Sequence, residues 1–280
     1  MKEIGSKKIS ETVRDLYIQA NYEISDDVLH ALNEAMSKEH SVSGKEIIRD
    51  LIKNAEIARK EVFPICQDTG LAVVFLEIGQ EVKITGGSVE DAVNEGISSA
   101  CKKGYLRRSV VADPFERKNT GSNTPAITHY QIVPGKNIKI TVMAKGGGAE
   151  NKSTFRMFKP TSSKGDIIDF VTETARTAGG AACPPFIIGV GIGGNLETST
   201  MLAKKALLRK VGIGNNNADT AQMESEMLEK INKTGIGPAG LGGTTTALSV
   251  AIEKAPCHIA SLPVTVNIDC HAHRVKEAVI

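Results

Sequence analysis

The amino-acid sequence predicts an α/β fold in which mixed β-sheets are flanked by helices. Apolar residues recur at helical spacing through residues 1–62, which indicates an N-terminal helical segment. Beyond it, further segments with helical spacing alternate with short apolar runs typical of strands. Because helices and strands alternate, we expect one α/β domain over residues 1–280, of which the helical segment is the opening part.

The composition indicates a globular protein and argues against several function classes. The 280 residues are 41% hydrophobic and 24% charged, which allows a sizeable core. A net charge of +2, an aromatic content of 4% and the absence of Trp argue against nucleic-acid binding. The N-terminus has no apolar targeting segment, and no apolar run approaches the roughly 20 residues of a membrane span. We therefore expect a cytoplasmic protein that does not bind a membrane.

Helices are expected first along the chain. Ile9, Val13 and Leu16 share one helix face, and Ser25 and Ser43 are suited to begin a second and a third helix. None of these residues suggests chemistry, so we expect this segment to serve packing or to face a partner.

Two strands, a helix and a long polar loop follow. The strands are expected at 71–78 and 81–84, and the helix at 89–101. The loop over 105–126 contains Arg107 and Arg108 among Asn, Thr and Gly residues. Long loops are often functional, and arginine can bind a carboxylate through two parallel hydrogen bonds. A carboxylate site is one interpretation of this loop, and solvated surface charge is the other.

A glycine-rich segment, KGGGAENK, covers residues 145–152 after strands expected at 127–133 and 138–144. Its three glycines let a ligand approach main-chain N–H groups closely, so the segment is either an anion-binding nest or an ordinary turn. It lacks the GxxxxGK[ST] spacing of a P-loop.

A second glycine motif, from Gly189 to Gly194, fits GxGxxG between an expected strand and an expected helix. An NAD-dependent oxidoreductase is therefore an alternative of another class. Against it, few strands follow the motif, and Asp219 does not stand at a strand end. A turn that presents N–H groups to a small anion is the other interpretation. The expected elements of this half are helices at 165–178, 196–210 and 219–232 and strands at 186–191, 247–252 and 264–268.

The cysteines do not form a disulfide framework. They are odd in number, scattered and without a CxxC pair, which excludes zinc ribbons and thioredoxin-like motifs. They remain inert core thiols, a catalytic thiol, or ligands that the fold brings together. Cys66 stands beside Gln67 and Asp68 at a helix-to-strand corner, where side chains can converge on a ligand.

Seven motifs together closely resemble the alpha subunit of two-subunit class I fumarases and L-tartrate dehydratases, which are iron–sulfur hydro-lyases. They occur in the family's order and span nearly the whole chain. The motifs are PICQDTG at 64–70, LRRS at 106–109, NTGSN at 119–123, KGGGAENK at 145–152, TAGGAACPP at 177–185, PCHIASLPV at 256–264 and NIDCHAHR at 267–274.

The resemblance implies that Cys66, Cys183 and Cys270 hold a [4Fe–4S] cluster. Most clusters use four protein thiolates, so three would leave one iron without a protein ligand. Such an iron is a Lewis acid that can bind a substrate hydroxyl and carboxylate. Cys101 and Cys257 match no ligand position; Cys101 is expected to be an inert helix thiol, and Cys257 has no assigned role.

The resemblance also implies roles for polar residues. Gln67 and Asp68 match residues at the substrate, with Asp68 a candidate acid that assists departure of the hydroxyl. Arg107 matches the carboxylate clamp, although Arg108 leaves the register open, and Gly147 matches a main-chain contact to a substrate carboxylate.

His258 matches the family's active-site histidine, 12 positions before Cys270 (270 − 258 = 12). His271 and His273 match no family position, and we expect them to be structural or to support the site from outside it.

The resemblance implies a partner as well. In single-chain relatives a second domain with the base and further carboxylate-binding residues follows, whereas this sequence ends at Ile280. We therefore expect a separate beta subunit, a hetero-oligomer of α2β2 type and a small dicarboxylate substrate. Reversible hydration of fumarate to L-malate is the preferred reaction. L-tartrate dehydration is the near alternative, and a non-catalytic iron–sulfur protein is a third.

Overall fold

The computed structural model describes residues 1–280, which form two compact units. Unit 1 comprises Met1–Ser25, Asn54–Gly147 and Arg274–Ile280, and unit 2 comprises Asp26–Lys53 and Gly148–His273. Each unit has its own apolar core and its own four-stranded mixed sheet flanked by helices. The predicted α/β class is thereby confirmed, and the assignment of residues 1–280 to one domain stays a prediction.

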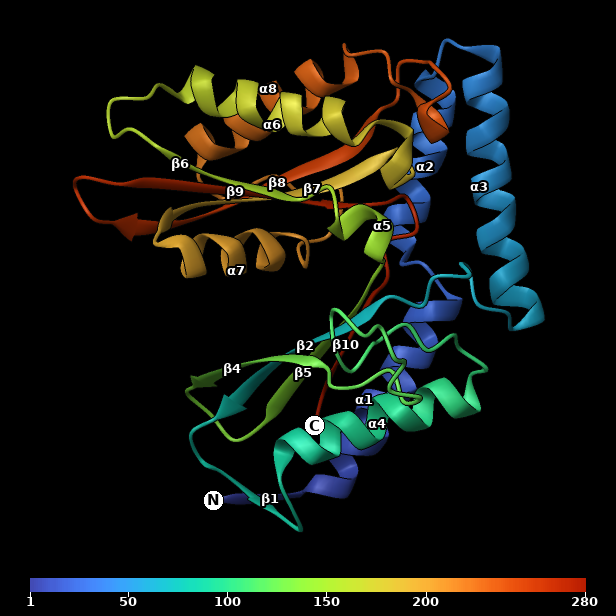
Figure 1. Ribbon diagram of the computed structural model, residues 1–280, viewed down its shortest axis with the longest axis vertical. Coiled ribbons are helices and arrows are strands. Elements are labelled where there is room, and N and C mark those ends of the chain that lie inside the picture. Colours follow the sequence, from blue (N-terminus) through green and yellow to red (C-terminus); the bar gives the residue numbers. More distant parts are fainter. The chain divides into compact units, whose positions relative to one another are not determined.

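Unit 1 is built on a sheet with the strand order β10-β5-β2-β4, in which only β2 and β4 are parallel. Helices α1 and α4 cover one face of it (Figure 1), and the alternate residues Ala72, Val74 and Leu76 of β2 join the core beneath them. A two-stranded sheet of β1 and β3 lies beside it. The bounds are β1 Lys2–Gly5, α1 Ser6–Tyr22, β2 Leu71–Gly79, β3 Val82–Thr85, α4 Val89–Lys103, β4 Ile127–Val133, β5 Ile138–Lys145 and β10 Val275–Val279.

Unit 2 has the strand order β6-β9-β7-β8, in which only β7 and β8 are parallel. Helices α6 and α8 lie on one face of this sheet and α7 on the other (Figure 1). The bounds are α2 Asp26–Lys38, β6 Thr154–Phe158, α6 Lys164–Ala178, η1 Gly179–Ala182, β7 Phe186–Gly194, α7 Leu196–Ala206, α8 Ala218–Asn232, η2 Pro238–Gly240, β8 Ala247–Cys257 and β9 Leu262–Asp269. Helix α3, Val42–Glu61, and the single turn α5, Gly147–Glu150, contribute residues to both units.

The predicted helical opening is confirmed as α1, α2 and α3. Three short strands, β1, β6 and β10, were not predicted. Gly147 and Gly148, two of the three glycines expected to form a turn or a nest, begin the helical turn α5. The helix expected to reach residue 210 ends at Ala206. No helix of the chain combines the length and the apolar character that crossing a membrane requires.

The GxGxxG motif lies within strand β7, and close packing explains two of its glycines. A Cβ atom on Gly189 would stand 2.1 Å from the carbonyl oxygen of Ala203, and one on Gly191 would stand 2.0 Å from that of Ser199. Both carbonyls belong to α7, so the missing side chains let this helix approach the strand. Strand β7 is also antiparallel to its neighbour β9. Helix packing thus accounts for these glycines without a nucleotide.

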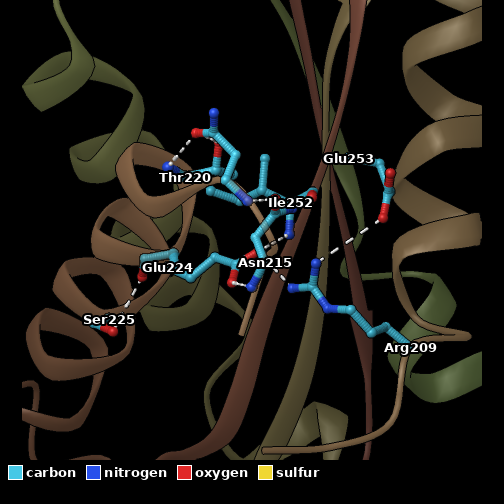
Figure 2. A network of polar contacts seen from close by, with 9 residues as sticks. Arg209, Asn215, Thr220, Glu224, Ser225, Ile252 and Glu253 are labelled. Atoms are coloured by element: carbon cyan, nitrogen blue, oxygen red, sulfur yellow. Dashed lines mark hydrogen bonds and ion pairs between the residues drawn. The ribbon is translucent and has the colours of Figure 1, made fainter. Parts of the chain in front are cut away.

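A buried carboxylate holds the segment between α7 and α8 in place (Figure 2). Glu224 of α8 is 5% exposed and forms an ion pair with Arg209. It also accepts N–H bonds from Asn215, at 2.9 Å, and Ile252 of β8, at 2.8 Å. The side-chain amide of Asn215 donates a hydrogen bond to the main-chain carbonyl of Ile252 at 3.0 Å. One carboxylate therefore joins α8, the connecting segment and β8.

A second buried carboxylate, Glu39, binds main-chain N–H groups. It is 1% exposed and accepts from Ser41, Thr244 and Thr245 at 2.9, 2.8 and 2.7 Å. Burial by itself would raise the pKa of this carboxyl, but these hydrogen bonds outweigh burial and lower the pKa to about 2. The ionised form of Glu39 is therefore part of the folded structure of unit 2.

Glu39 should make stability depend on pH in a defined window. Its pKa is lowered on folding from 4.5 to about 2, so its contribution is complete above about pH 4.5 and is lost as the pH falls toward 2. The contribution is on the order of 3 kcal/mol. We expect Glu39→Gln to lower the free energy of unfolding at pH 7 and to differ much less from wild type at pH 3. Urea unfolding at both pH values measures this, with exposed Glu46→Gln as control; an equal difference at both pH values would contradict it.

Candidate functional site

Residues 66–70, which we call the Cys66 corner, connect α3 to β2 in unit 1. Cys66 is half-buried, and the main-chain N–H of Asp68 points at its Sγ atom at 3.4 Å. The thiol also lies 3.5 Å from Oε1 of Gln67, whose side chain is exposed. An N–H donor directed at sulfur is the arrangement that stabilises and tunes a thiolate ligand of an iron–sulfur cluster.

The Asp68 carboxylate joins the corner to the glycine-rich segment. Its Oδ1 atom accepts from Gly70 N–H at 2.9 Å, and its Oδ2 atom accepts from Gly147 N–H at 2.8 Å. The structure thus brings Asp68, the predicted catalytic acid, and Gly147, a predicted substrate-binding residue, into direct contact. The Gly147 N–H that is expected to bind a substrate carboxylate is donated to Asp68 here, so a substrate would share or replace that bond.

Buried side chains fix the far end of the corner. The Tyr17 hydroxyl donates to the Gly70 carbonyl at 3.2 Å, and the Asn123 amide donates to the same two groups, the carbonyl at 3.2 Å and the hydroxyl at 3.1 Å. Asn123 also accepts from Ser109 N–H at 2.6 Å. The loop that carries Arg107 is therefore tied to the corner. Sequence reasoning missed this role of Tyr17 and Asn123, because nothing in either local pattern points to the other.

The two candidate arginines have different surroundings. Both side chains are exposed. Arg108 lies close enough to Cys101 of α4 to act on its thiol: burial raises the pKa of Cys101 to about 11, and the Arg108 charge opposes that rise. Arg107 stands two positions before Ser109, the anchored residue of the loop.

A buried thiol with a raised pKa, such as that of Cys101, is poorly suited to bind iron as a thiolate. This agrees with the expected inert role of Cys101.

In unit 2, Cys183 and the segment after Cys270 lie side by side. Cys183 is exposed and has left-handed backbone angles, φ 54° and ψ 65°, which are strained for a residue with a side chain. Its carbonyl accepts from the His271 main chain at 3.3 Å and lies 3.0 Å from Nδ1 of the His271 ring. His271, which had no predicted role in the site, joins the two cysteine-bearing turns.

His273 and Asp269 form a buried pair on either side of Cys270. Nδ1 of His273 lies 2.6 Å from Oδ2 of Asp269, and the two residues are 3% and 1% exposed. The pair closes the turn that follows β9 and therefore fixes the main chain that carries Cys270. This placement agrees with the expectation that His273 is structural.

His258 lies at the other end of the unit 2 sheet. It follows Cys257, which pairs with Gly194 at the end of β7, whereas Cys183 precedes the start of that strand. Strand β9 separates His258 from Cys270, and its 8 residues are extended over roughly 26 Å. Within unit 2 the structure does not bring His258 to the two cysteines. Its active-site role stays a prediction.

The predicted cluster ligands are chemically suited to iron. Cys66 and Cys270 are half-buried and Cys183 is exposed, and all three lie outside helices and strands. Thiolates are soft ligands of the kind that iron–sulfur clusters require. Cys66 belongs to unit 1, and Cys183 and Cys270 belong to unit 2. Each of the three, taken by its donor chemistry alone, is the kind of ligand that a [4Fe–4S] cluster uses.

Comparison with known proteins gives a match along almost the whole chain. The profile of the family "Fumarate hydratase (Fumerase)" matches residues 10–279. The chain is 42% identical over 273 residues to the "Putative L(+)-tartrate dehydratase subunit alpha" of Methanocaldococcus jannaschii, covering 95% of each chain. It is 31% identical over 277 residues to the "L(+)-tartrate dehydratase subunit alpha" of Escherichia coli K12, covering 98% of this chain and 91% of the relative. The chain therefore belongs to the fumarate hydratase (Fumerase) family of hydro-lyases.

Proposed function

We propose that this chain is the alpha subunit of a [4Fe–4S]-dependent hydro-lyase that acts on a small dicarboxylate together with a separate beta subunit. The observation that carries the proposal is the near full-length similarity to L(+)-tartrate dehydratase alpha subunits. Those names favour L-tartrate over fumarate as the substrate. We therefore propose L-tartrate dehydration, in place of the fumarate hydration preferred from the sequence. Fumarate remains the second substrate to test.

In this proposal Cys66, Cys183 and Cys270 hold the cluster. When bound, a cluster with one iron free of protein ligands supplies a Lewis acid for the substrate hydroxyl. The N–H of Asp68 supports the Cys66 thiolate, and His271 holds the Cys183 turn. The proposal leaves Cys101 and Cys257 outside the site.

The other residues of the site would bind the substrate and move a proton. Arg107 offers the paired donors that suit a carboxylate, and Gln67 offers an exposed amide beside Cys66. Dehydration removes a hydroxyl from one carbon and a proton from its neighbour. Asp68, in its protonated form, would deliver the proton with which the hydroxyl leaves as water and would become a carboxylate, and a base on the beta subunit would take the other proton.

Turnover assays with the alpha subunit alone and with a beta subunit test the proposal. We expect the iron-loaded pair to convert L-tartrate with a kcat/KM about tenfold or more above that for L-malate. The alpha subunit alone should be about 100-fold or more slower, because the base and the further carboxylate-binding residues proposed for the beta subunit are missing. A preference for malate and fumarate would identify a fumarate hydratase. An iron-loaded pair that is inactive on all these acids would favour the non-catalytic iron–sulfur protein.

A further inference from the structure

Arg274 is a fully buried cation in unit 1 that none of the predicted roles uses. It is 1% exposed and immediately precedes β10. Its Nη1 atom donates to the main-chain carbonyl of Asp68 at 2.7 Å and to Oδ1 of Asn21 at 3.0 Å, while Nε has no hydrogen-bond partner. Both acceptors are neutral oxygen atoms. Arginine is rarely buried so completely, and the desolvation of a guanidinium is costly, so the position requires an explanation.

Through its two acceptors, Arg274 reaches both ends of the segment 65–68 that contains Cys66: Asp68 is one end, and Asn21 binds Ile65 at the other. Asn21, near the end of α1, accepts from Ile65 N–H through its main-chain oxygen at 2.8 Å. It is itself held to α1 by a side-chain bond to the Tyr17 carbonyl at 2.9 Å. Nη1 of Arg274 therefore connects two groups. One is Asn21, which binds the N–H of Ile65 just before the Cys66 corner, and the other is the peptide group that follows Asp68.

The guanidinium also packs against the glycine-rich segment. A Cβ atom on Gly146 would stand 3.4 Å from Nη2 of Arg274 and 3.4 Å from Oδ2 of Asp68. The arginine, the carboxylate and the main chain at Gly146 are thus close neighbours. A positive charge here favours negative charge nearby. Thiolate ligands and a dicarboxylate are both anionic, and this explains why a cation rather than an apolar side chain occupies the position.

We propose that Arg274 is a positioning residue of the hydro-lyase site. It holds the peptide group of Asp68 in place. Cys66 then keeps the orientation in which it can bind the cluster, and the Asp68 side chain keeps the orientation in which it can reach the substrate. The inference about turnover rests on the proposed function. The inference about the geometry of the Cys66 corner does not, because it concerns this chain alone.

The first test is the alkylation of the full-length apoprotein by iodoacetamide, followed for each cysteine by peptide mass spectrometry. In Arg274→Met we expect Cys66 to react about tenfold faster, because loss of the two charge-assisted hydrogen bonds to Asp68 and Asn21 lets the corner open more often. Arg274→Lys, which keeps the charge and one or more donors, should lie between. Cys257, in unit 2, is the internal control and should not change. An unchanged Cys66 rate in a folded Arg274→Met protein overturns the proposal; if that variant does not fold, Arg274→Lys decides.

The second test is turnover by the iron-loaded pair with the beta subunit, expressed per mole of bound iron. We expect kcat of Arg274→Met to fall about 100-fold, since a displacement near 1 Å at the reacting groups can cost this much. KM should change little, because the Arg107 loop is anchored through Asn123 instead. Arg274→Lys should recover part of the loss. An iron-normalised kcat equal to that of wild type overturns the positioning role, whereas inactivity of the wild type on every dicarboxylate counts against the proposed function and leaves the alkylation result standing.

Arg209→Met is the matched control variant for both tests. It removes another largely buried guanidinium, one that belongs to unit 2 and pairs with Glu224 and Glu253. We expect it to lower stability but to keep the iron-normalised kcat close to wild type. If Arg209→Met lowers kcat as much as Arg274→Met does, general destabilisation explains both results and the proposal is wrong.

Discussion

Alanine substitution of Cys66, Cys183 or Cys270 is expected to abolish or strongly reduce the iron and sulfide of the anaerobically purified protein. Wild type should contain about four irons per chain, as a [4Fe–4S] cluster does. Each of the three cysteines lies on a turn with a half-buried or exposed thiol, and each loss removes a third of the protein ligands. Iron and acid-labile sulfide analysis of the purified variants measures the effect.

Two other cysteines provide the matched controls. Cys257→Ala removes an exposed thiol that bonds the Ser261 carbonyl at 3.3 Å, and Cys101→Ala removes a buried thiol of α4. Both variants should retain the iron of wild type. Full iron content in any one of the three ligand variants would remove that cysteine from the ligand set. Wild type that takes up no iron on anaerobic reconstitution would refute the cluster and the proposed mechanism with it.

Glu224→Ala is expected to destabilise unit 2 by about 3–5 kcal/mol, the usual cost of breaking a buried ion pair from one side. The substitution leaves Arg209 with only the longer contact to Glu253, at 4.0 Å. It also leaves two main-chain N–H groups, those of Asn215 and Ile252, without their carboxylate acceptor. Urea unfolding measures the loss. Hydrogen exchange of the α8 amides then shows whether the loss is located in unit 2.

Two further variants, Glu224→Gln and Glu229→Ala, are expected to lose less free energy of unfolding than Glu224→Ala does. Glutamine keeps one acceptor oxygen and should cost less than alanine. Glu229 lies on the same helix in an exposed ion pair with Lys233, and such pairs contribute little, so its removal should leave stability nearly unchanged. If Glu224→Ala is no more harmful than Glu229→Ala, the network in Figure 2 does not stabilise the fold.

The elements that could be predicted are those with strong periodicity. A helix with one buried face has apolar residues at helical spacing, and a strand buried on both faces is a continuous apolar run, so local sequence predicts both. The elements of this kind are the helices α1, α2 and α3 and the long strands β2, β5 and β7. The strands that were missed are short: β1, β6 and β10 have four or five residues and each pairs on one side only. Such strands owe their conformation to the neighbour they join, and no local pattern identifies that neighbour.

The candidate site shows the same limit more sharply. The cysteines and Asp68 were found through a resemblance, but the groups that hold them were not, because their partners are far away in sequence. Arg274 and Asp68 are 206 positions apart, and Asn123 and Tyr17 are 106 apart. His258 shows the reverse: only 12 positions separate it from Cys270 (270 − 258 = 12), yet an extended strand lies between them. Spacing along the chain indicates distance only where the conformation between two residues is known.

The discontinuity of unit 1 has a consequence for the biogenesis of the protein. Its sheet receives strand β10, and its Cys66 corner receives Arg274, only after all of unit 2 has been synthesised. At about 5–20 residues per second, a ribosome needs roughly 10–40 s to travel the 206 positions from Asp68 to Arg274. During that interval Cys66 has emerged without its final supports, so a nascent chain offers a loose thiol to oxidants or metals. Under the proposed function, we therefore expect iron to load onto the chain after Arg274 has been synthesised rather than before.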